Sequence, residues 1–492
     1  MEERTTLGDR WAAASPVRRR MRPLVWADPR ATIGEAARLL AGADDSCVLV
    51  RLPGGLGIAT DHDFRMALAD ASLSREAALS AICSVPAVTV NEHTDAPTAL
   101  VMMVERGIHH LVVTTDTDNP VGVVRVVDLA SAGLRDPLLV RRSVASARSL
   151  DDLREAAVIV PQTVLEMDEM GMPALRVSGI LSTVRDLIVQ RVAELTPTAV
   201  PTSHVSWLVL GSLARREALP HSDVDTALAW PAALDIRAPQ LRADAELVLR
   251  GLERCGLARC PDGANATEEL FSRSVDDWDA ATHRWTHHPE SESALLLASI
   301  VADNRPVTHV DLGSALTQSM LTSTRDRTFL SALLSFTLAV RPSRGLISDF
   351  TVAHTGPHRG QVDLKRGALW PVVLLGRWMA LAVGDPGGST IDRIRRGSQS
   401  ALLTAGEAED LIGAFEQIYQ LRFDQEIAAL KSGETPDSHV APRDIDPLRR
   451  RYLHDSLRAI SAIQTAVGRT WASGRKGRLD MADLSGPVSG HE

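Results

Sequence analysis

The sequence contains almost no lysine. Only Lys365, Lys431 and Lys476 occur among its 53 lysine and arginine residues. Tyrosine and phenylalanine are also scarce, with two and seven residues, whereas alanine is abundant. This pattern is typical of GC-rich codon usage rather than of a particular function. A lysine that persists in such a chain is nevertheless worth locating.

Positive charge is not in excess either. The net charge is −9, which argues against a nucleic-acid binder held by a general basic field. The chain has only four cysteines among 492 residues, too few for a disulfide framework. We therefore expect a reducing, cytoplasmic compartment.

Long hydrophobic runs are lacking. Residues 1–23 carry charges but no apolar core, so they do not form a signal peptide. The most apolar stretch, residues 368–383, is interrupted by Arg377 and is too short to span a bilayer. We expect no membrane association. The 45% hydrophobic and 23% charged content predicts a folded chain, and its length allows two to four domains.

A repeat with a spacing of about 65 residues is present near the N-terminus. Its first copy covers residues 31–64 and its second covers residues 95–129. Each copy has the pattern of a helix, a strand, a turn, a strand and the start of another helix. The apolar runs CVLV and LVVT are typical of buried strands.

The repeat resembles the CBS domain, and two copies form a paired module over residues 21–135. In that family, a hydroxyl and a carboxylate contact the ribose and phosphate of an adenine nucleotide such as AMP or ATP. The resemblance assigns these roles to Thr60 and Asp63, and in the second copy to Arg125 and Asp128. Many such pairs serve instead as packing or dimerisation modules. Both uses remain open, and the resemblance also implies a possible homodimer.

The most informative segment, residues 207–230, reads WLVLGSLARREALPHSDVDTALAW. WLVL predicts a buried strand, Gly211-Ser212 a tight turn, LARREAL a helix, and SDVDTALAW a second strand. Residues two apart on a strand share a face, so Asp223 and Asp225 present two carboxylates together. Such like charges call for a cation, and Mg²⁺ (or Mn²⁺) with nucleotide phosphates suits oxygen ligands. The Gly-Ser turn offers backbone N–H groups and a hydroxyl to a phosphate.

This segment resembles the nucleotidyltransferase superfamily signature, and GSLARREALPHSDVD is close to the form found in PII-protein uridylyltransferases. The resemblance implies that Gly211 and Ser212 hold the triphosphate of an NTP, and that Asp223 and Asp225 hold the metals. Arg215 is either a phosphate ligand or the partner of an ion pair with Glu217.

A third catalytic carboxylate normally comes from a later strand in this superfamily. We assign it to Asp303, which ends the apolar run SALLLASIVAD, with Asp311 as the alternative. Cys255 and Cys260 lack zinc-ligand spacing and are expected to be buried thiols. Three histidines lie nearby without a HExxH frame and are read as solvated or packing residues: His283, His287 and His288.

The C-terminal half shows apolar residues at helical spacing over residues 325–470, which predicts a helical bundle. The stretch VDLKRGALWPVVLLGRWMALAV resembles the C-terminal domain of a nucleotidyltransferase family. Its members join a CBS pair, a uridylyltransferase-like catalytic domain and this helical domain, which is thought to bind substrate. Lys365 lies in that stretch and could face the triphosphate, or could belong to an ordinary solvated basic pair.

The expected fold class is multidomain, α/β plus all-α. The predicted parts are a flexible N-terminus, a CBS pair, a helical connector, a polymerase-β-like nucleotidyltransferase domain, a helical substrate-binding domain and a flexible tail. Their expected bounds are 1–20, 21–135, 140–200, 201–318, 325–470 and 471–492.

The expected reaction is metal-dependent transfer of an NMP from an NTP to a hydroxyl on a protein or small-molecule acceptor, regulated by adenine nucleotide at the CBS pair. The HD hydrolase and ACT domains of full PII uridylyltransferases are missing from the sequence, so no uridylyl-removing activity is expected. The alternative is a nucleotide-sensing regulatory protein without catalysis.

Overall fold

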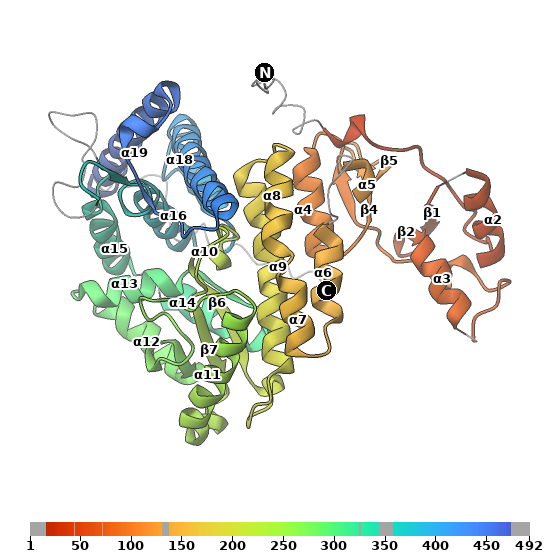
Figure 1. Ribbon diagram of the computed structural model, residues 1–492, viewed down its shortest axis with the longest axis horizontal. Coiled ribbons are helices and arrows are strands. Elements are labelled where there is room, and N and C mark those ends of the chain that lie inside the picture. Colours follow the sequence, from red (N-terminus) through yellow and green to blue (C-terminus); the bar gives the residue numbers. More distant parts are fainter. Residues whose placement is uncertain are drawn as a thin grey trace. The chain divides into compact units, whose positions relative to one another are not determined.

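The computed structural model describes residues 16–43, 45–70, 72–129, 137–323, 326–343 and 358–473. Most of the predicted flexible N-terminus and tail, residues 1–20 and 471–492, lies outside the described residues. The chain divides into two compact units (Figure 1). The first comprises Met1–Arg141 and Glu166–Arg176, and the second comprises Arg142–Leu165 and Val177–Glu492.

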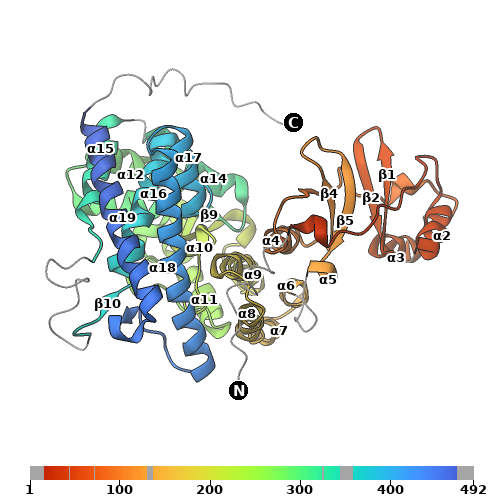
Figure 2. The same ribbon diagram turned by 90° about the horizontal axis from the view of Figure 1, so that it is seen from above.

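The first unit contains the predicted repeat. Its first copy consists of α2 (Ile33–Ala43), β1 (Cys47–Leu52), β2 (Gly55–Thr60) and α3 (Asp61–Ala69). Its second copy consists of α4 (Ala96–Arg106), β4 (His110–Thr114), β5 (Pro120–Arg125) and α5 (Val126–Leu129). Each strand pair is antiparallel, and β3 (Thr89–Asn91) joins β4 in parallel (Figure 2). The two-copy fold predicted from the sequence is confirmed.

The two copies share a core and an N-terminal segment. Leu49 of β1 and Val112 of β4 belong to one buried apolar cluster. The chain ahead of α2 pairs with both sheets, through Trp26 with Leu49 and through Arg22 with Val123. Burial of these β-branched and leucine side chains accounts for the continuous apolar runs in the sequence.

Four helices follow. They are α6 (Pro137–Ser146), α7 (Leu150–Ala157), α8 (Val160–Glu169) and α9 (Ala174–Leu195). The break predicted at Gly171 and Pro173 separates α8 from α9, and Gly171 adopts a φ of 73° there, which glycine accommodates without steric cost. The boundary between the two units falls within three of these helices, α6, α8 and α9.

The second unit contains a four-stranded sheet of order β8-β7-β6-β9. The strands are β6 (Ser206–Leu210), β7 (Thr226–Trp230), β8 (Ser272–Ser274) and β9 (Asn304–Pro306). β6 is buried along its whole length and pairs antiparallel with both β7 and β9. The accompanying helices are α10 (Gly211–Ala214), α11 (Ala238–Arg254), α12 (Val275–His287), α13 (Glu292–Val301) and α14 (Val310–Ser323).

Two local expectations around the motif need correction. LARREAL does not form a helix: α10 has only four residues, and Arg216 turns the chain with a φ of 60°. The strand carries neither aspartate, because β7 begins at Thr226, although the Asp225 carbonyl accepts a hydrogen bond from Leu210 N at 2.9 Å. The side chains of Asp223 and Asp225 remain near one another because the segment that carries them is still extended. Val224, between them, forms an isolated β-bridge with Arg259.

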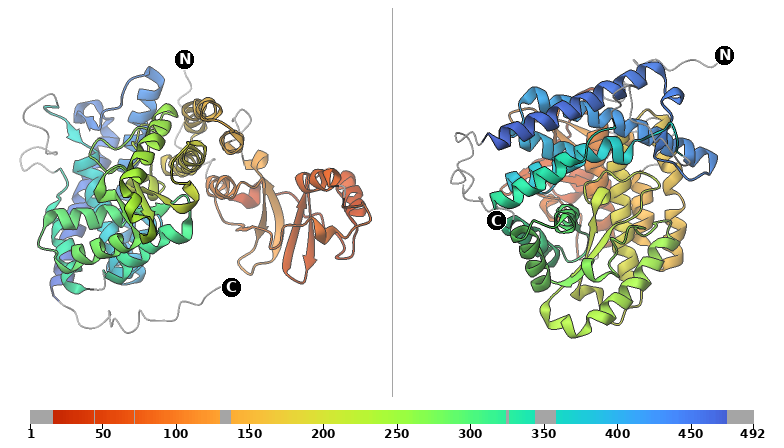
Figure 3. Two further views of the ribbon diagram at one scale, coloured as in Figure 1. Left: turned by 90° about the horizontal axis from the view of Figure 1, so that it is seen from below. Right: turned by 90° about the vertical axis from the view of Figure 1, so that its left-hand side faces the viewer.

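The C-terminal half is helical, as predicted. It consists of α15 (Arg327–Ala339), a π-helical turn (Lys365–Leu369), α16 (Trp370–Val383), α17 (Thr390–Gln399), α18 (Ala405–Ser432) and α19 (Pro447–Ala472), with a short ladder of β10 (Val362–Asp363) and β11 (His439–Val440). The long helices α18 and α19 pack against each other and are drawn in blue in Figure 3.

The π-helical turn and α16 make one continuous helical run, Lys365–Val383. Its 19 residues are long and apolar enough, by length and composition alone, to cross a membrane, which differs from the expectation for residues 368–383. However, 72% of the apolar window is buried inside the protein. Burial of this degree is what a core helix of a folded domain requires.

Candidate active site

The Gly-Ser turn lies at the end of β6 and presses against one of the motif aspartates. Gly211 has a φ of 59°, and a Cβ atom there would lie 2.3 Å from Asp225 Oδ2. The backbone N–H of Gly211 donates to the Asp303 carbonyl at 3.1 Å. Only glycine combines this left-handed backbone with so close an approach. The local sequence therefore places the Asp225 carboxylate directly beside the turn.

Two carboxylates and a thiol converge at this turn. The ligand atoms of Asp223, Asp225 and Cys260 all lie within 4.8 Å of one another. Burial raises the pKa of Asp225, and the neighbouring charge of Asp223 acts in the same direction. A divalent cation would relieve the repulsion between the two carboxylates, and oxygen ligands suit Mg²⁺. The two carboxylates fit the predicted metal, whereas the Cys260 thiol is not a ligand that Mg²⁺ favours.

Cys260 is a component that the sequence did not reveal as part of the site. It is a buried free thiol, as expected. Burial raises the pKa of Asp225, and the hydrogen bond from Cys260 partly offsets that rise. Burial, and then the Asp225 charge, raise the pKa of Cys260 to about 12. The loop reaches the site because Asn265 bonds to both the N–H and the carbonyl of Cys260. The spacing of residues in the sequence does not predict this contact between Cys260 and Asp225.

Ser212 follows Gly211 and is half-buried. Because α10 is a single turn, it contributes few aligned peptide dipoles. Attraction of a phosphate would therefore rest on local N–H and hydroxyl groups and on nearby cations, rather than on a helix macrodipole. Ser212 stays a predicted nucleotide ligand.

Lys365 is exposed at the first position of the π-helical turn. The Asp363 carboxylate accepts hydrogen bonds from the backbone N–H groups of Lys365 and Arg366, at 2.8 and 3.0 Å. Burial raises the pKa of Asp225, and the charge of Lys365 opposes that rise only weakly. Lys365 stays a predicted nucleotide ligand.

The Arg215 side chain is buried and paired with two carboxylates. Its Nε donates to Glu217 at 2.8 Å, and its guanidinium also contacts the Asp303 carboxylate. Of the two roles predicted for Arg215, the ion pair with Glu217 is confirmed. The arginine is buried, so a phosphate would have to compete with two carboxylates for it.

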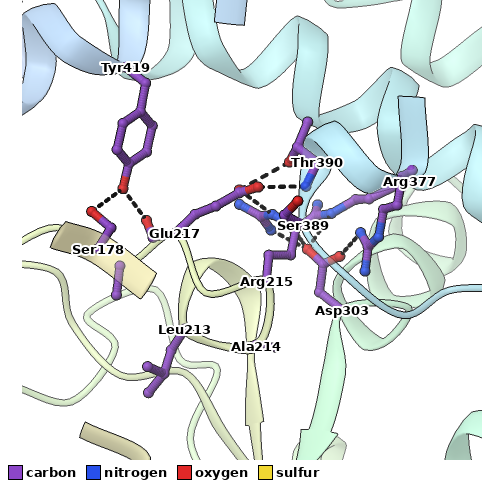
Figure 4. A network of polar contacts seen from close by, with 12 residues as sticks. Ser178, Leu213, Ala214, Arg215, Glu217, Asp303, Arg377, Ser389, Thr390 and Tyr419 are labelled. Carbon is purple, nitrogen blue, oxygen red and sulfur yellow. Dashed lines mark hydrogen bonds and ion pairs between the residues drawn. The ribbon is translucent and has the colours of Figure 1, made fainter. Parts of the chain in front are cut away.

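Asp303 lies in a cluster of buried charges (Figure 4). Its carboxylate is 0% exposed and contacts the guanidinium groups of Arg215, Arg377 and Arg393. Although burial raises the pKa of Asp303, the positive charges of these arginines hold it well below its usual range. A carboxylate so occupied is a structural anion. These contacts would have to loosen before Asp303 could serve as the third catalytic carboxylate, a role that stays a prediction.

The same cluster joins the sheet to the C-terminal helices. Glu217 accepts hydrogen bonds from Thr390 N at 2.5 Å and from Thr390 Oγ1 at 3.0 Å. The Tyr419 hydroxyl lies 2.8 Å from the Ser178 hydroxyl and 2.8 Å from the Glu217 carbonyl oxygen (Figure 4). Charged and polar contacts therefore fix α17 and α18 against the loop that follows the Gly-Ser turn.

The alternative carboxylate, Asp311, lies exposed in the first turn of α14 and is not among the grouped ligands described above. His283 and His287 stack on one another along α12, with ring centroids 3.8 Å apart. Among the described residues, neither belongs to the ligand group of the Gly-Ser turn.

The residues predicted to bind a nucleotide in the first unit pair with each other. The Thr60 hydroxyl and N–H both donate to Asp63 Oδ2, each at 2.7 Å, and cap α3. Arg125 makes a bidentate contact with Asp128, at 2.9 and 2.8 Å. A bound nucleotide would have to replace or share these contacts. Replacement would cost more in the second copy, because the Arg125–Asp128 hydrogen bonds join two charged groups whereas those of Thr60 to Asp63 involve only one.

Comparison with known families places these features together. The family model described as "Putative nucleotidyltransferase DUF294" matches residues 159–292. The one described as "Putative nucleotidyltransferase substrate binding domain" matches residues 327–471, and the CBS domain model matches residues 79–135. The first two together cover more than half of the chain. The chain belongs to the DUF294 nucleotidyltransferase family.

The DUF294 assignment agrees with the architecture described above: a CBS domain, a nucleotidyltransferase domain and a C-terminal helical domain. At this coarse level the domain content is that of a nucleotidyltransferase with a nucleotide-binding regulatory module. The CBS family model covers the second copy of the repeat, whereas the first copy is recognised by its fold.

Several solved structures similar to this DUF294 chain are described as CBS-domain proteins. A further match is an uncharacterized conserved protein from Pyrococcus horikoshii, with 23% identity over 24% of this chain and 90% of that chain and a TM-score of 0.22. Another is a CBS domain protein from Pyrobaculum aerophilum complexed with AMP, with 23% identity over 26% and 96% of the two chains and a TM-score of 0.22. No curated protein matches.

Proposed function

We propose that the protein transfers an NMP group from an NTP to a hydroxyl of a protein or small-molecule acceptor, as the PII uridylyltransferases that its motif resembles do. The observation that carries the proposal is the packing of the Gly211 turn against Asp225, with Asp223 alongside. In the reaction, the acceptor oxygen bonds to the α-phosphorus as the bond to pyrophosphate breaks.

Each residue of the site has a defined part in this proposal. Asp223 and Asp225 would hold Mg²⁺ (or Mn²⁺), which when bound neutralises charge on the phosphates. Gly211 leaves room for a phosphate beside the backbone, and Ser212 supplies a hydroxyl donor. Lys365, exposed at the start of the π-helical turn, would add a positive charge for the triphosphate.

The decisive experiment is incubation of the full chain with Mg²⁺, each of the four labelled NTPs in turn, and a cell lysate. In the variant Asp223→Ala/Asp225→Ala we expect label transfer and pyrophosphate release to fall by about 100-fold or more, because a metal contributes several kcal/mol and each 1.4 kcal/mol is tenfold. The pair Glu409→Ala/Asp410→Ala, exposed on α18, removes the same charge and should leave transfer unchanged. Equal transfer in both variants would refute the assignment.

A second candidate function is a nucleotide sensor without catalysis. The observation that favours it is the occupation of Asp303 by three arginines, which leaves two carboxylates and a thiol at the site. NTP binding in calorimetry, without pyrophosphate release in any lysate, would support the sensor. Pyrophosphate release that depends on Asp223 and Asp225 would eliminate it.

Regulation through the CBS pair is the second part of the proposal. Thr60→Val removes the hydroxyl assigned to the nucleotide, and since one hydrogen bond contributes about 0.5–1.5 kcal/mol, AMP or ATP binding should weaken about 2- to 12-fold. Thr98→Val is a matched control, because the Thr98 hydroxyl also donates to a capping aspartate, Asp95, at 2.7 Å. Calorimetric titration measures both. Equal affinity for the two variants would contradict the role of Thr60.

A further inference from the structure

A second group of metal-ligating side chains lies in the C-terminal half. The ligand atoms of His358, Asp437 and His439 all lie within 4.8 Å of one another. None of the three belongs to the site at Gly211. The group therefore needs an explanation independent of nucleotidyl transfer.

Backbone pairing brings these residues together from distant parts of the chain. In the ladder of β10 and β11, Val362 pairs with Val440 and Asp363 with His439. One residue further, Leu364 N donates to the Ser438 carbonyl at 2.9 Å. The ladder has only two residues in each strand, so backbone pairing alone gives it little stability.

The spacing of the donor atoms suits one ion. His358 Nδ1 lies 3.2 Å from Asp437 Oδ2, and His439 Nδ1 lies 2.8 Å from Asp437 Oδ1. Ligands on a tetrahedral Zn²⁺, each about 2.0–2.2 Å from the ion, are about 3.3–3.6 Å apart. The two imidazole rings stack with centroids 3.7 Å apart. The ring planes are 12° apart, so one imidazole would have to turn for both histidine nitrogens to point at one ion together with Asp437.

Neighbouring groups add an orienting shell. Asp363 Oδ2 lies 3.9 Å from His439 Nε2, the nitrogen on the far side of the ring from Asp437. A carboxylate orients a metal-bound histidine and raises its basicity when it accepts a hydrogen bond from the ring, for which Asp363 would have to approach His439 by about 1 Å. Gln361 Oε1, 3.0 Å from His358 Nδ1, offers a further oxygen.

We propose that His358, Asp437 and His439 bind a divalent transition metal, with Zn²⁺ as the preferred ion, at a site separate from Asp223 and Asp225. Two imidazoles and one carboxylate match zinc, copper or nickel, whereas Mg²⁺ favours oxygen ligands. The side chains of His358, His439 and Asp437 are 39%, 23% and 51% exposed, so an ion can reach them from solvent.

The metal would also steady the segment that carries Lys365. Asp363, which faces His439, accepts the backbone hydrogen bonds that begin the turn at Lys365 and Arg366. Clamping His358 and His439 together therefore fixes the ladder on which this turn depends. Zn²⁺ should slow amide hydrogen exchange in residues 361–366 and 437–440.

The test uses the full chain after removal of metals with a chelator. Zn²⁺ is titrated in competition with a zinc indicator, and Co²⁺ is added as a probe whose visible absorption reports its ligands. We expect one equivalent of Zn²⁺ bound at this site. In His358→Ala/His439→Ala the affinity should fall by about 100-fold or more, and the Co²⁺ spectrum should change. Asp437→Asn, a milder change, should weaken binding without disturbing the fold.

Two further variants distinguish this site from other metal sites. His283→Ala/His287→Ala removes another stacked pair of histidines, on α12, and should leave the tight Zn²⁺ site intact. Asp223→Asn/Asp225→Asn should also retain it, so that failure of the proposed transfer activity and failure of this proposal are separate outcomes. Absence of Zn²⁺ binding by the unaltered protein, or its loss only in one of these two variants, would overturn the proposal.

Discussion

Replacing Asp303 with asparagine is expected to destabilise the second unit by about 3–5 kcal/mol, because removal of one member of a buried ion cluster leaves the remaining charges uncompensated. Three guanidinium groups contact this carboxylate, and Glu217 is the other carboxylate in the cluster. Urea denaturation followed by tryptophan fluorescence measures the change, since Trp378 is buried next to Arg377 in α16.

The matched control is Asp410→Asn, which makes the same chemical change on the exposed face of α18 and should alter the free energy of unfolding by about 0.5 kcal/mol or less. In the double variant Asp303→Asn/Arg393→Gln, the loss should be smaller than the sum of the two single losses, because the partners are in direct contact. Additive losses, or a loss for Asp303→Asn no larger than the control's, would contradict the assigned role.

The same cluster predicts a pH dependence of stability. The folded-state pKa of Asp303 is held below its ordinary value by the arginines, so its contribution is complete above about pH 4 and disappears as the pH falls further. Asp303→Asn should therefore be less stable than the unaltered protein at neutral pH, and the difference should shrink in strong acid.

Replacing Gly211 with alanine should reduce nucleotidyl transfer by about 100-fold or more. The added Cβ would meet Asp225 Oδ2 at 2.3 Å, so the carboxylate or the turn must move. The left-handed backbone of Gly211 adds about 1–2 kcal/mol of strain for any residue with a side chain. A displacement of this kind alters the position of Asp225 relative to Asp223 and closes the space beside the backbone.

NTP binding, pyrophosphate release and the free energy of unfolding are measured for Gly211→Ala. Together they separate a loss of activity at the site from a loss of stability caused by backbone strain. Gly413→Ala is the control, because this glycine lies in α18 with nothing within 4 Å of an added Cβ. That substitution should stabilise the helix by about 0.5–1 kcal/mol and leave transfer unchanged. Full activity in Gly211→Ala would show that the turn does not hold the nucleotide.

The sequence by itself determined the division into a CBS repeat, a nucleotidyltransferase motif and a helical half. It did so because apolar periodicity and the glycine-serine turn are local properties, encoded in neighbouring residues. The pairing of Asp223 and Asp225 was predictable for the same reason: residues two apart in an extended segment share a side, whether or not the strand proper includes them.

Contacts between distant residues were decided only by the tertiary structure. Asp303 looked like the missing carboxylate because it follows an apolar run, but its partners Arg377 and Arg393 come from helices more than 70 residues later. Cys260 reaches Asp225 through a loop whose course depends on Asn265, and His358 meets His439 only because two short strands pair. Burial and charge compensation act between side chains close in space, so these contacts have no signature in the order of the residues.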